Sequence, residues 1–457
     1  MLAALICLLL TIPVIIYLVR EKRKPKSIAF FHPYCNAGGG GERVLWAAIR
    51  AMQKSHPNYK YYVYSGDFDA NKEEILLKAR QRFGIELDPE NVEFVYLYSR
   101  RLVEADLYPH FTMLMQAIMG GFLALEALFH LVPEVFIDSM GYPLALPIFR
   151  IFAGAKVGAY VHYPTISCDM LEVVSTRQST FNNSSLIAQS HILSILKLYY
   201  YRLFSFFYFL AGKSAKIVMV NGKWTQRHIC SIWSRKDVEI VYPPCDVEAF
   251  LEIESQAENL FEETKILRIL SVGQIRPEKN HRLQIEILHD VKNRLKSDVE
   301  VRLCIAGGCR NEEDRKRVED LKAYAQELNV AENLEFKVNI PYEDLIQELS
   351  RSLISLHTMH NEHFGISVVE AMAASTILVS NDSGGPQMDI VRDFEGKCVG
   401  FLSISREEYT ETILRIVEKS RETRDEIRKF ARKSLERFGE LAFENGWNRE
   451  VEKLLKN

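Results

Sequence analysis

Short apolar runs of β type alternate with helical stretches along most of this chain, and no other feature constrains its fold as strongly. Strands separated by helices in this way pair in parallel, and helices cover both faces of the sheet. The sequence therefore predicts an α/β fold of doubly wound, Rossmann-like sheets. The predicted strands are Ser27–His32, Tyr59–Tyr64, Val92–Tyr96, Glu134–Asp138, Ala155–Val161, Lys216–Val220, Arg268–Val272, Val299–Ala306, Leu334–Lys337, Leu353–His357 and Thr376–Ser380.

The length of 457 residues allows two or three domains. A proline-rich junction at 242–246 is followed by an acidic stretch without clear periodicity up to residue 264, which indicates a boundary. We expect a transmembrane anchor over residues 1–20, a first domain over 27–245, a second domain over 246–430 and a helical tail over 431–457.

The N-terminal segment Leu2–Val19 carries no charged residue and is long enough to approach a bilayer span. The basic segment Arg20–Lys26 follows directly, so the positive-inside rule predicts a single-pass anchor with the rest of the chain in the cytosol. A cleaved signal peptide is the alternative, disfavoured because the segment lacks a basic start and a small-residue cleavage pattern. Glycans on the sequons at Asn182 or Asn183 would require that alternative.

Two further segments are unusually apolar. Phe111–Val132 contains a single charge, Glu126, and is interpreted either as a buried helix or as a membrane-contacting one. His191–Gly212 combines many aromatic residues with Lys197 and Arg202, which favours a helix in the membrane interface over a buried helix. A full span is not expected for either, because it would place part of one doubly wound sheet across the membrane.

Charge and cysteine content exclude several classes of protein. A net charge of −3 argues against a nucleic-acid binder, which would carry a basic surface. The 8 cysteines are scattered without a CxxC pair, so neither a zinc site nor a disulfide framework is predicted. Reduced thiols are expected.

The most informative motif carries two glutamates, Glu362 and Glu370. Gly365 interrupts any helix through it, so Glu362 is predicted to lie in the loop after the strand Leu353–His357. Ser367 is predicted to cap the next helix, with Glu370 at capping-box spacing. Loops at this edge of a parallel sheet bind ligands, and carboxylates suit sugar or ribose hydroxyls. Glu370 thus has two interpretations, helix cap or ligand, whereas Glu362 has only the functional one.

The loop Gly273–Asn280 follows another predicted strand and carries a basic pair. Arg276 can grip phosphate oxygens with two N–H groups, and Lys279 adds a point charge three residues on. Together they would neutralise a leaving diphosphate, the main electrostatic demand of transfer from a nucleotide sugar. A surface location is the usual alternative for such a pair, but the Glu362 loop in the same α/β unit favours the functional interpretation.

Two weaker signals lie in the first half. The run Gly38-Gly39-Gly40-Gly41 after the first strand allows close approach of the backbone to an anion. It lacks the spacing of a P-loop or a dinucleotide fingerprint, and a flexible loop is the alternative. His162 ends a predicted strand, where a functional and a structural role are equally open.

These motifs resemble those of a known family. Glu362 and Glu370, followed by Ala-Met-Ala, resemble the two-glutamate motif of the retaining GT-B glycosyltransferases of family four, and Gly273–Lys279 resembles their diphosphate loop. The resemblance covers essentially the whole second domain. Residues 31–42, 161–164 and 383–386 are similar to the mannosyltransferases that extend dolichyl-diphosphate oligosaccharides in asparagine-linked glycosylation.

The resemblance implies two Rossmann-like domains facing a cleft and a retaining α-1,2-mannosyltransferase that uses GDP-mannose. Its acceptor would be a trimannosyl chitobiose on dolichyl diphosphate, extended by the fourth and fifth mannoses at the cytosolic face of the endoplasmic reticulum membrane. Other mannosyltransferases of the pathway are candidate partners, and no nucleic acid and no metal cofactor are expected. A transferase for another GDP- or UDP-sugar on a lipid acceptor, or an inactive membrane scaffold, remains open.

The resemblance also implies residue roles. Glu370 would bind the ribose of GDP, and Glu362 the mannose hydroxyls or the reacting face. Arg276 and Lys279 would hold the diphosphate, and His162 would approach the transferred sugar. In a front-face mechanism the departing phosphate helps deprotonate the acceptor, so no nucleophile and base at glycosidase spacing are needed. The remaining expected donor-binding residues are Gly38, Gly39, Gly40, Gly41, Gly365, Ser383, Gly384 and Gly385.

Overall fold

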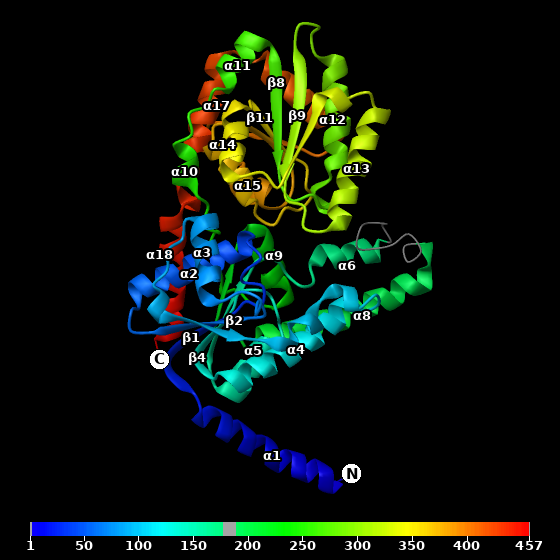
Figure 1. Ribbon diagram of the computed structural model, residues 1–457. Coiled ribbons are helices and arrows are strands. Elements are labelled where there is room, and N and C mark those ends of the chain that lie inside the picture. Colours follow the sequence, from blue (N-terminus) through cyan, green and yellow to red (C-terminus); the bar gives the residue numbers. More distant parts are fainter. Residues whose placement is uncertain (1, 177–188, 457) are drawn as a thin grey trace. The chain divides into compact units, whose positions relative to one another are not determined.

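The computed structural model describes residues 2–176 and 189–456, so the sequons at Asn182 and Asn183 lie outside the described residues. The chain forms two compact units (Figure 1). Unit 1 consists of Met1–Pro243 and Phe443–Asn457, and unit 2 of Pro244–Ala442. Each unit contains one parallel sheet, which confirms the predicted α/β fold.

The sheet of unit 1 has the order β3-β2-β1-β4-β5-β6-β7, and its strands pair in parallel. Its strands are β1 (Lys24–Phe31), β2 (Lys60–Ser65), β3 (Val92–Tyr96), β4 (Pro133–Asp138), β5 (Lys156–Val161), β6 (Ile217–Val220) and β7 (Val238–Ile240). Its main helices are α1 (Leu2–Glu21), α2 (Gly40–Ser55), α3 (Lys72–Phe83), α4 (Thr112–His130), α5 (Ala145–Ile148), the π-helix η4 (Phe149–Ala153), α6 (Cys168–Ser175), α8 (His191–Gly212) and α9 (Lys223–Ile232).

The sheet of unit 2 has the order β10-β9-β8-β11-β12-β13 and is also parallel. Its strands are β8 (Ile266–Val272), β9 (Glu300–Gly307), β10 (Leu334–Val338), β11 (Ile354–His357), β12 (Ile377–Asn381) and β13 (Phe401–Ser403). Its main helices are α10 (Val247–Leu251), α11 (Ala257–Thr264), α12 (His281–Arg294), α13 (Glu312–Glu327), α14 (Tyr342–Arg351), α15 (Ile366–Ala373), α16 (Arg406–Glu418) and α17 (Arg421–Lys433).

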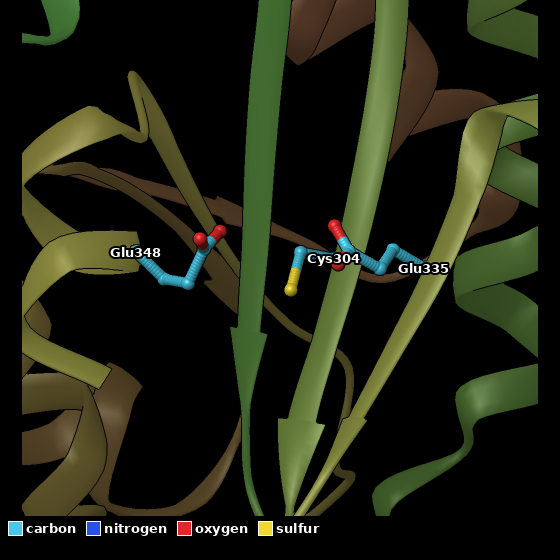
Figure 2. A group of neighbouring side chains, drawn as sticks. All are labelled: Cys304, Glu335 and Glu348. Carbon is cyan, nitrogen blue, oxygen red and sulfur yellow. The ribbon is translucent and has the colours of Figure 1, made fainter. Parts of the chain in front are cut away.

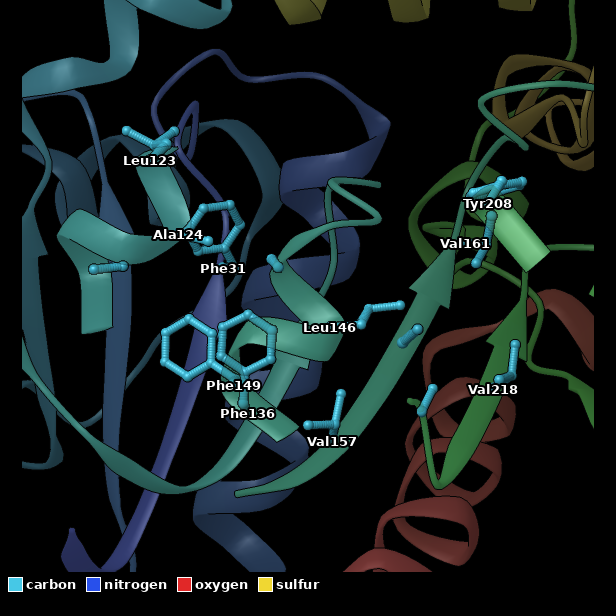
Figure 3. Close-up of a cluster of buried hydrophobic side chains, with 14 of the residues drawn as sticks. Phe31, Leu123, Ala124, Phe136, Leu146, Phe149, Val157, Val161, Tyr208 and Val218 are labelled. Atoms are coloured by element: carbon cyan, nitrogen blue, oxygen red, sulfur yellow. The ribbon is translucent and has the colours of Figure 1, made fainter. Parts of the chain in front are cut away.

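A core of aromatic and aliphatic side chains covers one face of the unit 1 sheet (Figure 3). Phe136 of β4 and Phe149 of η4 stack with ring centroids 3.8 Å apart, and Phe31 of β1 lies 5.9 Å from Phe136. Leu123 of α4 and Tyr208 of α8 are buried in the same core. Both apolar segments of the first half are therefore helices that pack one face against the sheet.

Helix α4 is apolar and is buried on one face only. Among the helices whose side chains the structure describes along their full length, it is the one long and apolar enough to cross a membrane, judged by length and composition alone. Its buried face includes Gly120, Ala124 and Leu128, which face the protein core. A core helix of a soluble domain has the same composition, so this finding is weak evidence for a span.

Helix α18 (Glu440–Leu455) differs from the predicted tail over 431–457, because the chain returns in it to unit 1. The Trp447 ring lies 6.2 Å from the Phe30 ring and 5.6 Å from the Tyr160 ring, with both partners in the sheet core. Phe443 and Leu454 are buried in that core as well. The apolar stripe at helical spacing was concealed by the high charge of the rest of the helix.

The short strands β7 and β13 were not predicted, because three residues are too few to show a period. The stretch after residue 246, predicted to lack pattern, contains the helices α10 and α11. Every strand that was predicted is present: Val92–Tyr96 coincides with β3, and the others differ from the prediction at one or both ends.

Candidate functional site

In unit 2 the strand order reverses between β8 and β11, where ligands bind in doubly wound sheets. Lys279 ends the short helix η5 (Pro277–Lys279) after β8, and Glu362 lies in the turn after β11. The Lys279 ammonium donates to the Glu362 carboxylate. The structure thus joins the predicted basic loop and the predicted acidic loop at the switch point.

Two neighbours hold Glu362 as a carboxylate in a largely buried position, with its side chain 13% exposed. His357, at the end of β11, donates from Nε2 to Glu362 Oε2 across 3.1 Å. Burial alone would raise the pKa of Glu362, but the charge of Lys279 and the hydrogen bond from His357 outweigh it, and the pKa lies well below its usual range. Glu362 is therefore an ionised acceptor near neutral pH.

Two buried polar side chains fix the backbone of the Lys279 loop by hydrogen bonds. Thr358, directly after β11, donates its hydroxyl to the Lys279 carbonyl at 2.9 Å. Gln284 of α12 donates its amide to the same hydroxyl at 2.9 Å. The Thr358 side chain thus ties the segment after β11 to the main chain of the Lys279 loop, so the Lys279–Glu362 pair is preorganised.

The segment Ser383-Gly384-Gly385 lies against the Glu362 turn. The Asn361 N–H donates to Ser383 Oγ at 2.8 Å, and the Gly385 N–H donates to the Glu362 carbonyl at 2.7 Å. A Cβ on Gly384, whose φ is +59°, would lie 2.2 Å from the same carbonyl oxygen. Glycine is required there by both contact and conformation, and the segment supports the turn that holds Glu362.

The predicted capping box of α15 is wrong. Gly365 is the N-cap residue, with φ +105°, and the helix begins at Ile366. Ser367 therefore lies inside the first turn, and Glu370 lies in the body of the helix, where it is not the partner of a serine cap. The ligand interpretation of Glu370 stays a prediction.

Arg276 precedes η5 and is half-buried. Its guanidinium lies 3.7 Å from Glu278 Oε1, and both side chains are more than a third exposed. An exposed ion pair of this kind is weak, so the Arg276 guanidinium can exchange Glu278 for another anion.

His281, His357 and Gln284 surround the pair and were not predicted as site residues. His281 opens α12, and no partner for its Nδ1 is found among the described residues. Burial, followed by the charge of Lys279, lowers the pKa of His281 to about 4. His357 ends β11, and His281 and Gln284 lie in the first turn of α12, which follows the β8 loop. These positions could have indicated them, since the strand ends face the switch point.

In unit 1 the strand order reverses between β1 and β4. His32, which follows β1, is fully buried, with Nδ1 2.9 Å from Ser139 Oγ and Nε2 3.3 Å from Glu42 Oε1. Asp138, at the end of β4, accepts the N–H groups of Met140 and Gly141. Burial raises the pKa of Asp138 to about 6 against these hydrogen bonds. These groups form a polar cluster at the second switch point.

The glycine run forms the start of α2, which begins at Gly40 with Gly39 as its N-cap. The Gly39 N–H donates to the Glu42 carboxylate, so a carboxylate of the chain itself occupies that amide. A methyl group on Gly41 would lie 3.7 Å from His162 Nε2. The run and His162 thus meet at one edge of the sheet.

Among the described residues one group has the composition of a metal site: Cys304, Glu335 and Glu348 (Figure 2). Lys337 lies 3.0 Å from Glu348 and 3.5 Å from Glu335, and Arg268 lies 3.1 Å from Glu348. Burial raises the pKa of the Cys304 thiol to about 12, whereas a metal requires the thiolate. The two carboxylates are explained as ion-pair partners of two cations.

The prediction of no metal overlooked one Asp-x-Asp pattern, Asp67-Phe68-Asp69. The Asp67 carboxylate pairs with Arg100 and also accepts the Asn36 N–H at 2.9 Å. The Asp67 carboxylate thus has hydrogen-bonding partners within unit 1 itself.

Comparison with known proteins covers both units. Residues 25–233 match the family described as "ALG11 mannosyltransferase N-terminus", and residues 252–434 match "Glycosyl transferases group 1". The chain is 70% identical to the Caenorhabditis elegans "GDP-Man:Man(3)GlcNAc(2)-PP-Dol alpha-1,2-mannosyltransferase", over 95% of this chain and 92% of that protein. It is 48% identical to the Homo sapiens protein of the same name, over 99% and 94%.

A solved structure shares the fold. The crystal structure of Anabaena Alr3699/HepE in complex with UDP and glucose aligns with a TM-score of 0.62, 16% identity and coverage of 93% of this chain and 99% of that one. The expected GT-B architecture is thereby confirmed.

Proposed function

The chain belongs to the family of GDP-Man:Man(3)GlcNAc(2)-PP-Dol alpha-1,2-mannosyltransferases, and we propose that Lys279 and Glu362 form the centre of its donor site. It is a glycosyltransferase that moves mannose from GDP-mannose to a dolichyl-diphosphate oligosaccharide in α-1,2 linkage. The observation that carries the site assignment is the Lys279–Glu362 ion pair at the switch point of unit 2.

In this proposal the cations of the β8 loop receive the diphosphate. An ammonium group has three N–H donors, so Lys279 can keep Glu362 and still donate to a phosphate oxygen. Arg276, released from its exposed pair with Glu278, adds a second positive charge. The leaving diphosphate gains negative charge in the transition state, and preorganised cations stabilise that charge, so no metal ion is needed for this step.

Glu362 and Glu370 would bind hydroxyl groups of the donor. Glu362 is ionised and oriented by His357, so its carboxylate accepts hydrogen bonds from mannose hydroxyls or lies at the reacting face. Glu370 lies on α15, and its carboxylate would accept hydrogen bonds from the ribose hydroxyls of GDP. The turn that carries Glu362, with Gly365, Ser383, Gly384 and Gly385, keeps the carboxylate in place.

Unit 1 carries the remaining residues of the proposal, the glycine run and His162. Its polar groups at the β1–β4 switch point lie with the glycine run at one edge of the sheet. His162 would approach the transferred sugar, and the backbone of Gly38–Gly41 would pass close to the donor. Retention would follow a front-face path, in which the departing phosphate accepts the proton of the acceptor hydroxyl.

A lipid-linked acceptor implies that the enzyme works at a membrane. The exposed face of α8 is apolar, as a membrane-contacting surface would be. Exposed apolar side chains recur along the helix at intervals of three or four residues, while Tyr201 and Tyr208 on the other face are buried. We propose that this outer stripe lies in the membrane interface, with α1 as a single-pass anchor and both units in the cytosol at the endoplasmic reticulum. The stripe is Ile192, Ile195, Leu196, Tyr199, Leu203, Phe206, Phe207 and Leu210.

The proposal is tested by incubating the purified enzyme with labelled GDP-mannose and a defined lipid-linked trimannosyl acceptor. The product is expected to grow by two successive hexoses that an α-1,2-mannosidase removes. UDP-sugars are expected to give no product. Turnover with a UDP-sugar and none with GDP-mannose would overturn the donor assignment.

A further inference from the structure

Helix α1 runs into the unit 1 sheet with almost no linker, since it ends at Glu21 and β1 begins at Lys24 (Figure 1). Over its described C-terminal half most side chains are exposed, but Ile16 and Val19 are half-buried. Val19 packs against the core that covers the sheet. These two residues are three apart, so they lie on one face of the helix, and that face contacts unit 1.

Two arginines of this end bind carbonyl groups of η4 and of its C-cap residue, Gly154. Arg20 Nη2 donates to the Ile151 carbonyl at 2.9 Å, and Arg23 Nη1 donates to the Gly154 carbonyl at 3.1 Å. Carbonyls at the end of a helix lack partners within it, so they are ready acceptors for a guanidinium. The contacts cross 131 residues of sequence and join the N-terminal helix to the covering layer of the sheet.

Glycine at position 154 permits this contact because it has no side chain. It adopts φ +60°, and a Cβ there would lie 3.1 Å from Arg20 Nε, closer than a side-chain carbon normally approaches. A glycine thus both ends η4 and leaves room for the guanidinium. The clasp is defined as Arg20, Arg23, Ile151 and Gly154.

We infer that the clasp fixes α1 at one angle to unit 1 and so holds the acceptor side of the enzyme at a set height and tilt on the membrane. The inference rests on the proposed function, in which α1 is the anchor and the acceptor is lipid-linked. A freely jointed anchor would let unit 1 rotate over the surface, whereas the diphosphate and the oligosaccharide that carry the reacting hydroxyl limit its distance from the bilayer. Arg20 and Arg23 are therefore positioning residues for a membrane-held acceptor.

Positive charge near the end of α1 also sets membrane orientation, so the test needs a charge-matched control. Lys22 provides it, because it lies between the two arginines and no side-chain partner is found for it among the described residues. Arg20→Gln and Lys22→Gln remove the same charge from the same segment, but only the first breaks the clasp.

Full-length enzyme in vesicles is assayed with two trimannosyl acceptors, one on vesicle-held dolichyl diphosphate and one on a short, water-soluble lipid. Arg20→Gln is expected to lower the rate on the dolichyl acceptor about 10-fold, because misplacement of reactants is costly, and to leave the rate on the soluble acceptor unchanged. Lys22→Gln is expected to change neither rate. A Gly-Ser-Gly insertion after Glu21 is expected to reproduce the Arg20→Gln result.

Equal loss on both acceptors would show a structural role and overturn the inference, as would unchanged rates in both the arginine variant and the insertion variant. If the unaltered enzyme turned over neither acceptor, that result would instead contradict the proposed function. The two failures are thereby distinguished.

Discussion

The ammonium of Lys279 and the carboxylate of Glu362, 83 residues apart in sequence, form an ion pair where the strand order of unit 2 reverses. The pair is largely buried, and the Thr358 hydroxyl, directly after β11, donates to the main chain of the Lys279 loop. The geometry therefore exists before a donor arrives, and preorganised charge of this kind contributes most to catalysis.

Glu362→Gln keeps the size of the side chain and removes the charge opposite Lys279. We expect kcat to fall by about 100-fold or more, as when one preorganised group is removed from an active site. Stability should fall by about 3 kcal/mol, because Lys279 is left buried without its partner. Transfer rate and thermal unfolding are measured together, with Glu332→Gln on the exposed surface as control. A full transfer rate in Glu362→Gln would contradict the site.

Gly384→Ala tests the support of the Glu362 turn. The new methyl group would overlap the Glu362 carbonyl, so the turn must shift and activity should fall at least 10-fold, roughly the cost of displacing a catalytic group. Gly396→Ala is the matched control, because Gly396 also has positive φ but a Cβ there meets nothing within 4 Å. The control should lose about 1 kcal/mol and keep its activity. Equal activity in both variants would show that the contact has no functional role.

Gly41→Ala separates activity from stability. Its methyl group would fit at 3.7 Å from His162 Nε2 without a clash, and alanine favours the helix by about 1 kcal/mol. The midpoint of unfolding should therefore not fall, whereas transfer should fall about 10-fold because the methyl group takes space proposed for the sugar. Gly446→Ala, in the body of α18, should leave transfer unchanged. An unaltered rate in Gly41→Ala would place the sugar elsewhere.

His281 predicts a pH dependence of stability. Its pKa is about 4 in the folded chain and about 6.5 in the unfolded chain, so between these values the unfolded chain binds more protons. Stability should fall as pH falls from about 6.5 to about 4, by roughly 3 kcal/mol in full. His281→Gln should flatten this part of the profile in urea unfolding, and His289→Gln on the same helix should not. The same slope in all three proteins would contradict the assignment.

The outer stripe of α8 should contact lipid. A phospholipid with a photoreactive diazirine in its acyl chain, incorporated into vesicles with the full-length enzyme, is expected to label Phe206 and Phe207. The exposed face of α17, which is highly charged, should remain unlabelled and serves as the internal control. Labelling of α1 without labelling of α8 would show that the stripe faces water or another protein.

Much of the fold was predictable because buried parallel strands have a strong apolar pattern. The exceptions have physical causes: β7 and β13 are too short to show a period, and α18 hides four core residues among charges. No local pattern reveals that α18 returns to unit 1, because that contact is made with strands hundreds of residues earlier.

The site was predictable where chemistry and position coincide, as at Lys279 and Glu362. It was missed where residues act through others: His357 orients Glu362, and Thr358 fixes the Lys279 loop, yet neither has an unusual sequence context. The helix start at Ile366 was misplaced because Ser367 is a good cap, while the left-handed conformation of Gly365 is visible only in three dimensions.

The return of the chain through α18 has a consequence for biosynthesis. Unit 2 is inserted within unit 1, and the side chains of Phe443, Trp447 and Leu454 that complete the core of unit 1 leave the ribosome after all of unit 2. Unit 2 can fold while the chain is still attached to the ribosome. Unit 1 is synthesised first, but part of its apolar core stays exposed until α18 has been made. A nonsense mutation in the codons of α18 would therefore damage unit 1, the part of the chain that is synthesised first.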